Sequence, residues 1–183
     1  LLAGGFQRTY HLFVPDSATA DSPRPLLVVL HGGGSKGRQV EFYTGFDEYA
    51  ARDGFLVVYP DAYKGNWNDG RTDFHSKAVE AEVDDVAFIT AVIEHLCDTR
   101  PVDPARIYIA GVSNGGMMTQ RMAAEKTDLF AAAAMVISSI PATLLPNLRP
   151  TAPVPILMIN GTDDPLVKWG GGELEVIKGR PRG

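Results

Sequence analysis

The sequence predicts an α/β fold in which a mainly parallel sheet is covered by helices on both faces. Leu26–Leu30, Phe55–Tyr59 and Ile107–Ala110 are short, continuous apolar runs, which are typical of strands buried on both sides. Amphipathic segments lie between these runs, and strands alternating with helices indicate parallel strands joined by crossover connections. Because ligands in such sheets bind beyond the carboxyl ends of the strands, the residues that follow each strand are the candidates for a functional site.

Local patterns predict the remaining elements. Arg8–Val14 alternates between polar and apolar residues and ends at Pro15, which indicates an edge strand. Aromatic residues at helical spacing predict one helix over Glu41–Arg52, ended by Gly54. The segment Asp61–Ala81 has no periodicity and predicts a long loop. The other expected elements are helices at Val83–Asp98 and Asn114–Thr127, a turn at Pro101–Ala105, and strands at Ala132–Ile137 and Ile156–Asn160.

Composition limits the class of protein. The chain has 183 residues, 45% of them hydrophobic and 21% charged, which fits a single packed domain over residues 1–183. Its net charge of −5 argues against nucleic acid as a partner, because phosphate binding needs a basic surface. The apolar runs are far shorter than the ~20 residues of a membrane span. The single cysteine, Cys97, excludes an intrachain disulfide and a cysteine-based zinc site.

The sequence Gly-Val-Ser-Asn-Gly-Gly at residues 111–116 follows the third apolar run and precedes a helical pattern. It matches the G-x-S-x-G motif, in which a sharp strand-to-helix turn lifts a nucleophilic serine off the sheet. Ser113 is the candidate nucleophile, and the amino end of the following helix would favour a developing anion. The alternative is a glycine-rich turn with an incidental serine.

A second motif, His-Gly-Gly-Gly at residues 31–34, follows the first buried strand. Loops of this kind supply an oxyanion-hole amide, because glycine lets the backbone turn an N–H toward the substrate. We expect the donors to be the backbone amides of Gly33 and Asn114, with Gly34 as the neighbour that would replace Gly33. His31 is expected to hold the loop. A phosphate-binding loop is the weaker alternative, because the order of residues is not GxxxxGK[ST].

An acidic pair follows the last predicted strand, in the sequence Asn-Gly-Thr-Asp-Asp-Pro at residues 160–165. A catalytic triad on such a sheet runs in the order serine, acid, histidine. We choose Asp164 over Asp163 as the acid, and the alternative is that both only form a turn. The chain has histidines at positions 11, 31, 75 and 95 and none after Asp164. Because domains of this type run to about 250 residues, we expect the chain to be truncated before the histidine.

These motifs and their flanks resemble secreted polyhydroxybutyrate depolymerase-type esterases and the related feruloyl and acetylxylan esterases. The resemblance runs through Gly5–Pro15, Leu30–Gly37, Gly54–Asp61, Val102–Met118 and Ile159–Gly172, and includes Trp67–Arg71 and Val83–Val86.

The resemblance implies an α/β-hydrolase fold with Ser113 as nucleophile, Asp164 as acid, and Gly33 and Asn114 as oxyanion donors. It implies an ester substrate (hydroxyalkanoate, feruloyl or acetyl), no metal or organic cofactor, and a secreted or periplasmic location. Trp67 and Trp169 are expected to line the substrate cleft, with ordinary packing as the alternative. Two other functions stay open: a prolyl-oligopeptidase-like peptidase, and a binding protein that lacks turnover because the histidine is missing.

Overall fold

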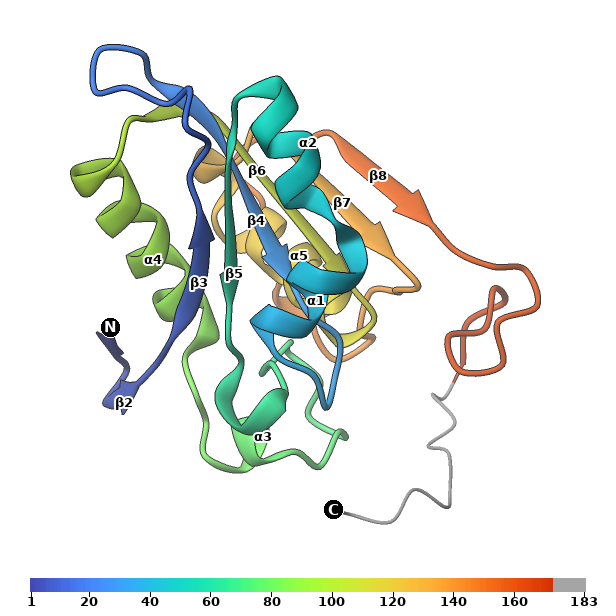
Figure 1. The fold of residues 1–183 in the computed structure, drawn as a ribbon. Coiled ribbons are helices and arrows are strands. Elements are labelled where there is room, and N and C mark those ends of the chain that lie inside the picture. Colours follow the sequence, from blue (N-terminus) through green and yellow to red (C-terminus); the bar gives the residue numbers. More distant parts are fainter. Residues whose placement is uncertain (173–183) are drawn as a thin grey trace.

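The computed structural model describes residues 1–172 and shows a six-stranded, mainly parallel sheet between two layers of helices (Figure 1). The strand order is β3-β5-β4-β6-β7-β8, and only β3 runs antiparallel to its neighbour. The strands of this sheet are β3 (Tyr10–Phe13), β4 (Arg24–Leu30), β5 (Leu56–Pro60), β6 (Val102–Val112), β7 (Ala132–Val136) and β8 (Ile156–Ile159). The two-residue strands β1 (Leu2–Ala3) and β2 (Phe6–Gln7) form a separate hairpin. The predicted fold class is confirmed.

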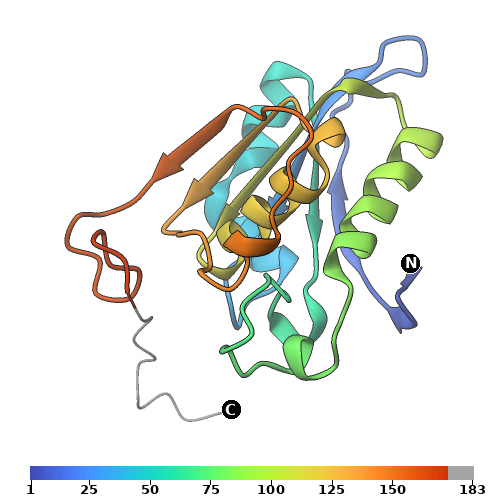
Figure 2. The ribbon, with the colours of Figure 1, turned by 180° about the vertical axis from the view of Figure 1, so that it is seen from behind.

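Helices cover both faces of the sheet, as the two opposite views show (Figures 1 and 2). The helices α1 (Gly37–Thr44) and α2 (Phe46–Asp53) pack on one face, and α4 (Asp85–Thr99) and α5 (Asn114–Glu125) on the other. Short elements lie in the loops: η1 (Tyr63–Gly65), α3 (Lys77–Glu80), η2 (Thr127–Leu129) and η3 (Leu145–Asn147). In the described part of the chain, no helix is long and apolar enough to cross a membrane.

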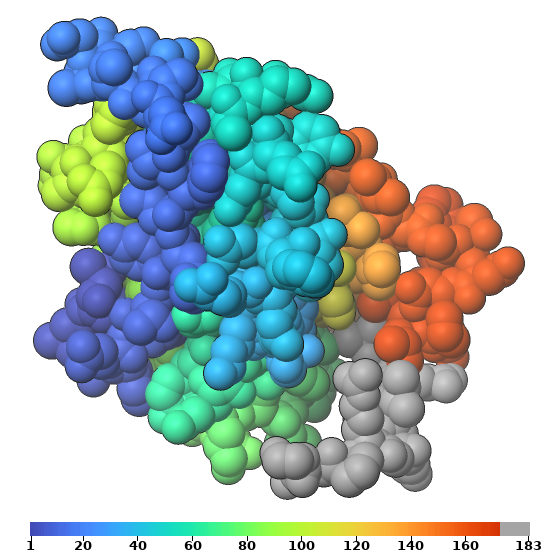
Figure 3. Space-filling model, in the orientation of Figure 1, coloured from blue at the N-terminus to red at the C-terminus, as the bar shows by residue number. Residues whose placement is uncertain are grey.

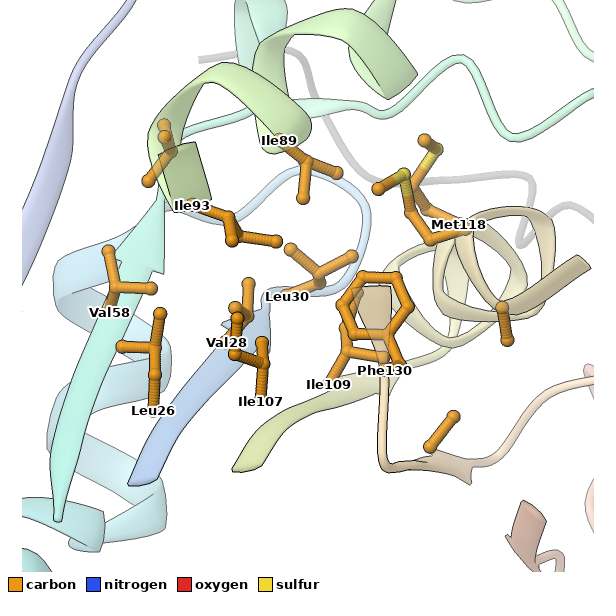
Figure 4. Packing of buried hydrophobic residues seen from close by; sticks show 14 of the residues in the cluster. Leu26, Val28, Leu30, Val58, Ile89, Ile93, Ile107, Ile109, Met118 and Phe130 are labelled. Carbon is orange, nitrogen blue, oxygen red and sulfur yellow. The ribbon is translucent and has the colours of Figure 1, made fainter. Parts of the chain in front are cut away.

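The larger hydrophobic core lies between the sheet and helices α4 and α5 (Figure 4). Alternate residues of β4 face it, because successive side chains of a strand point to opposite sides of the sheet. Leu26, Val28 and Leu30 pack there with Ile89 and Ile93 of α4. The side chains between them, such as Val29, contribute to the smaller core under α1 and α2. Strand β4 is therefore buried from both sides, as its continuous apolar run predicted.

Two expectations about local structure were wrong. The single helix predicted over Glu41–Arg52 is two helices, because Gly45 has φ 62° and ends α1 in the left-handed conformation. The turn predicted at Pro101–Ala105 is instead the irregular start of β6. Val102 already pairs with Arg24 there, and the register shifts before Ile107 pairs with Leu26.

The last strand lies at the edge of the sheet. All four side chains of β8 are apolar and between 47% and 57% exposed. The segment after β8, coloured orange to red, stands out from the body of the molecule (Figure 3). The central strands β4 and β6 therefore have packed surroundings that β8 lacks.

Candidate active site

Ser113 occupies the sharp turn between β6 and α5. Its backbone has φ 55° and ψ −121°, a conformation that is strained for any residue with a side chain. The strain is held by packing and by a hydrogen bond of 2.9 Å from the Ser113 N–H to the carbonyl oxygen of Val136 in β7. The residue is half-buried, at the carboxyl end of the central strand. This is the geometry of a nucleophile elbow.

The flanking glycines leave space for backbone that passes very close to them. A Cβ atom on Gly111 would overlap the carbonyl oxygen of Gly115, and one on Gly115 would overlap the carbonyl oxygens of Leu30 and His31. The first turn of α5 thus sits directly against the carboxyl end of β4. The glycines of the motif are required by this close approach, which the sequence pattern predicted.

The glycine loop after β4 lies beside the elbow. Gly33 is exposed, and its N–H has no acceptor among residues 1–172. An ideal Cβ atom on Gly33 would lie 3.6 Å from the Cβ atom of Asn114 and 2.8 Å from Oδ1 of Asn66. The Gly34 N–H instead donates to the carbonyl oxygen of Gly65 at 2.8 Å, so it is already used. Of the two candidate donors in the loop, only Gly33 offers an unengaged N–H.

His31 holds this loop and is fully buried. Its Nε2 accepts the backbone N–H of Ala62 at 3.0 Å, so its Nδ1 carries the proton that is donated to the carbonyl oxygen of Gly32 at 2.8 Å. Burial lowers the pKa of His31 below its usual value. A buried, neutral imidazole with both nitrogens engaged is a structural group, as expected.

The lowered pKa of His31 predicts a stability that falls in mild acid. The unfolded chain takes up a proton near pH 6.5 while the folded chain resists it, so stability is present above about pH 6.5 and lost below it. The largest slope for one proton is about 1.4 kcal/mol per pH unit. Urea unfolding from pH 8 to 5 should show the stability difference between wild type and His31→Gln shrinking below pH 6.5. A difference that stays constant across this range would contradict the prediction.

Trp67 does not line a cleft, which corrects the expectation for this residue. Its side chain is 0% exposed, and its indole Nε1 donates to the carbonyl oxygen of His31 at 2.9 Å. The ring also packs on the His31 imidazole, with 5.2 Å between centroids. An aromatic side chain without exposed surface cannot contact a substrate. Trp67 instead supports the glycine loop from the protein interior, through its bond to His31.

The side chain of Asn114 pairs with the backbone of Trp67. Its Oδ1 accepts the Trp67 N–H at 2.8 Å, and its Nδ2 donates to the Trp67 carbonyl oxygen at 3.1 Å. The same Nδ2 donates to Oδ2 of Asp69 at 2.6 Å. Besides the proposed role of its backbone N–H, Asn114 therefore uses its side chain to bind Trp67 and Asp69. The sequence did not indicate these bonds, because the partners lie 45 and 47 residues away.

Asp69 and Arg71 also belong to this site, although the sequence indicated no role for either residue. Their ion pair is 2.7 Å long, and the Asp69 side chain is 0% exposed. The guanidinium of Arg71 also lies 3.9 Å from the ring centroid of Phe74. The available signal was the Trp-Asn-Asp-Gly-Arg stretch itself, in which a polar, glycine-bearing loop carries a tryptophan and opposite charges.

The structure places Asp164 five residues after β8, in a turn. Its Oδ1 accepts the backbone N–H groups of Leu166 and Val167, both at 2.8 Å. The side chain of Asp164 is half-buried, whereas Asp163 is exposed. Asp164 shares the carboxyl edge of the sheet with Ser113, and no contact joins the two within residues 1–172.

Trp169 lies on the segment after β8 and is 67% exposed. The structure brings it into no contact with Ser113 or Gly33 among the residues described. Two surface hollows are lined by other residues, one around Tyr63 and Lys77 and one around Asn68 and Arg121. In the described part of the chain, no group of three or more histidine, cysteine, aspartate or glutamate side chains could hold a metal ion.

Comparison with known proteins gives consistent relatives. A sequence model of the prolyl oligopeptidase family matches residues 41–143. The candidate esterase NocK of Nocardia uniformis subsp. tsuyamanensis is 35% identical over 174 residues, covering 93% of this chain and 49% of the relative. Feruloyl esterase B of Piromyces equi is 31% identical over 173 residues, covering 91% of this chain and 31% of the relative. The chain therefore spans half or less of the length of these curated relatives.

Solved structures agree with the fold. A thermostable esterase matches with a TM-score of 0.70 and 26% identity, over 91% of this chain and 46% of that one.

Poly(3-hydroxyalkanoate) depolymerase C of Paucimonas lemoignei is a further relative found by sequence, 30% identical over 134 residues, which are 73% of this chain and 31% of the relative. The resemblance to depolymerase-type and feruloyl esterases is confirmed by these matches.

Proposed function

The chain belongs to the prolyl oligopeptidase family of α/β-hydrolases, and we propose that it is the nucleophile-bearing part of a serine carboxylesterase, like its esterase relatives. The observation that carries the proposal is the juxtaposition of a strained Ser113 with the unengaged N–H of Gly33 and the first residue of α5, Asn114. These groups are what acyl transfer needs at one place: a nucleophile and two amide donors for an oxyanion.

In the proposed reaction, the hydroxyl oxygen of Ser113 attacks the ester carbonyl. The carbonyl oxygen becomes an oxyanion and accepts hydrogen bonds from the Gly33 and Asn114 amides. The alcohol then leaves, taking the proton that Ser113 gave up, and water cleaves the acyl-enzyme. A histidine oriented by Asp164 carries the protons in this scheme. We place that histidine outside residues 1–183, because none of the four present lies after Asp164.

The substrate class follows from the relatives and is part of the proposal. NocK, the feruloyl esterases and the poly(3-hydroxyalkanoate) depolymerase are named for ester hydrolysis. We therefore propose a carboxylic ester of the feruloyl, acetyl or hydroxyalkanoate class. The resemblance to secreted esterases leads us to propose a secreted or periplasmic location as well. Peptide bonds are the second candidate, because the matching family model is named for oligopeptidases.

Covalent labelling tests the nucleophile. The full natural chain that contains this sequence should gain one adduct with a fluorophosphonate probe, measured by intact-protein mass spectrometry. Ser113→Ala should gain none, whereas Ser17→Ala, at a serine in the loop before β4, should label like wild type. An unchanged adduct in Ser113→Ala would reject the proposed nucleophile. Residues 1–183 alone should not label; if they do, the general base lies inside this chain, and His75 in the long loop becomes the residue to replace.

Substrate assays separate the two classes of bond. The full natural chain should hydrolyse p-nitrophenyl acetate and methyl ferulate and leave prolyl p-nitroanilide peptides intact. Hydrolysis of the peptides without hydrolysis of the esters would replace the esterase proposal by the peptidase one. Labelling at Ser113 would then still hold, because both classes use the same nucleophile.

A further inference from the structure

A buried carboxylate is bound to the residue that follows the nucleophile. Oδ2 of Asp69 accepts Nδ2 of Asn114 at 2.6 Å, and both side chains are almost inaccessible to solvent. Hydrogen bonds to a charged acceptor are shorter and stronger than those between neutral groups. Asn114 is the first residue of α5, so this bond acts one residue away from Ser113.

The charge of Asp69 is balanced locally. Arg71 Nη2 lies 2.7 Å from Oδ2, Arg71 Nε lies 3.0 Å from each carboxylate oxygen, and the Arg71 N–H donates to Oδ1 at 3.2 Å. A bare carboxylate near an oxyanion site would raise the energy of the developing negative charge. With Arg71 paired to it, Asp69 keeps its hold on Asn114 while much of that repulsion is offset.

The side chain of Asn114 connects the start of helix α5 to the glycine loop, the two elements that carry the proposed oxyanion donors. Its amide pairs with the N–H and carbonyl of Trp67, and Trp67 in turn donates to the carbonyl oxygen of His31, the residue before the glycine loop. The loop residue Asn66 lies against Gly33. One connected set of hydrogen bonds therefore runs from Asp69 through Asn114 and Trp67 to the base of the loop that carries Gly33.

We propose that Asp69 is a positioning residue, which fixes the Asn114 side chain and so keeps the backbone N–H groups of Asn114 and Gly33 aimed at the transition-state oxyanion. This inference rests on the proposed function. Asp69 touches neither substrate nor reacting atoms; it acts through Asn114 alone. Arg71 forms an ion pair with this carboxylate and holds it in place.

The proposal predicts an effect on the chemical step. An oxyanion forms only in the transition state, so misaligned donors lower kcat and leave KM nearly unchanged. A misplacement of about 1 Å can cost about 10²-fold in rate, whereas loss of a whole donor costs about 10²–10³. We therefore expect Asp69→Ala to lower kcat by about 10- to 100-fold, with KM within about threefold.

The test uses the full natural chain, with p-nitrophenyl acetate as substrate and rates divided by the concentration of active sites, counted as fluorophosphonate adducts after labelling to completion. Asp69→Asn keeps an oxygen that accepts from Asn114 and should restore most of kcat. Asp103→Ala is the matched control, because Asp103 forms a 2.6 Å pair with Arg106 at the amino-terminal end of β6. Its kcat and KM should equal those of wild type.

The outcomes are distinct. A merely structural role would lower the thermal midpoint and the fraction of titratable sites but leave kcat per titrated site unchanged in Asp69→Ala, and that result overturns the proposal. If Asp69→Ala does not fold, Asn114→Ala removes the hydrogen bonds of the Asn114 side chain, including the one to Asp69, while keeping the backbone N–H. It should show the same drop in kcat at constant KM, and an unchanged kcat there also overturns the proposal. A wild-type enzyme that does not hydrolyse p-nitrophenyl acetate would instead reject the esterase function itself.

Discussion

Replacing Asp164 with asparagine should lower kcat for ester hydrolysis by about 10⁴-fold in the full natural chain. In the structure, Asp164 Oδ1 accepts two backbone N–H groups, from Leu166 and Val167. An asparagine oxygen can accept the same two bonds, so the turn should survive the substitution. The other oxygen, Oδ2, has no partner among residues 1–172, and the substitution turns it into an NH₂ donor. A histidine that needs an acceptor there would be held in the wrong tautomer.

Asp163→Asn is the matched control for this substitution. Asp163 is adjacent and exposed, and its side chain makes no hydrogen bond within residues 1–172. The kcat of the Asp163→Asn variant should therefore stay near the wild-type value. Both variants are measured by steady-state ester hydrolysis, with circular dichroism to show that each is folded. The reverse result would assign the acid to Asp163. Wild-type rates in both variants would mean that the acidic pair only forms the turn.

The sheet could be predicted because its signal is local. Runs such as Leu26–Leu30 and Ile107–Ala110 are apolar without alternation, and a strand buried on both faces is the simplest structure that uses every residue of such a run. The break at Gly45 was missed because the aromatic spacing continues across it. The irregular start of β6 was missed because Pro104 suggested a turn, and the register shift that accommodates it depends on the neighbouring β4.

The elbow and the glycine loop could be predicted for a related reason. Glycine at positions 111 and 115 is itself a sequence signal, because only glycine allows the backbone to approach so closely. The role of Trp67 leaves no such signal in the sequence: its loop has no periodicity, and its burial depends on a carbonyl group 36 residues away. The same holds for the bond between Asp69 and Asn114. Side chains that join distant loops are determined by the packed fold, and one sequence does not reveal them.

Breaking the buried ion pair of Arg8 and Asp85 should cause a large loss of stability. Arg8 Nη2 lies 2.6 Å from Asp85 Oδ1, and the two side chains are 2% and 0% exposed. Arg8 also donates to the carbonyl oxygen of Asp61 and lies 4.0 Å from the ring centroid of Phe88. The second oxygen of Asp85 accepts the N–H of Asn68 at 2.7 Å, so the pair also binds the loop that contains Trp67 and Asp69.

Asp85→Ala should therefore lower the free energy of unfolding by about 3–5 kcal/mol, because it leaves the Arg8 charge buried without its partner. Urea unfolding at pH 7 of the full natural chain measures this loss. Asp53→Ala, at the exposed pair of Arg52 and Asp53, should leave the unfolding midpoint unchanged.

The double variant Arg8→Met/Asp85→Leu separates the cost of an unpaired charge from the value of the pair. Burial raises the pKa of Asp85 even though Arg8 opposes the shift, so the ion pair only partly compensates the loss of hydration. Two apolar side chains remove that loss altogether, and we expect the double variant to recover most of the stability that Asp85→Ala loses. If it is as unstable as the single variant, the stability comes from the hydrogen bond between Asn68 and Asp85, which both variants delete, and the charges themselves contribute little.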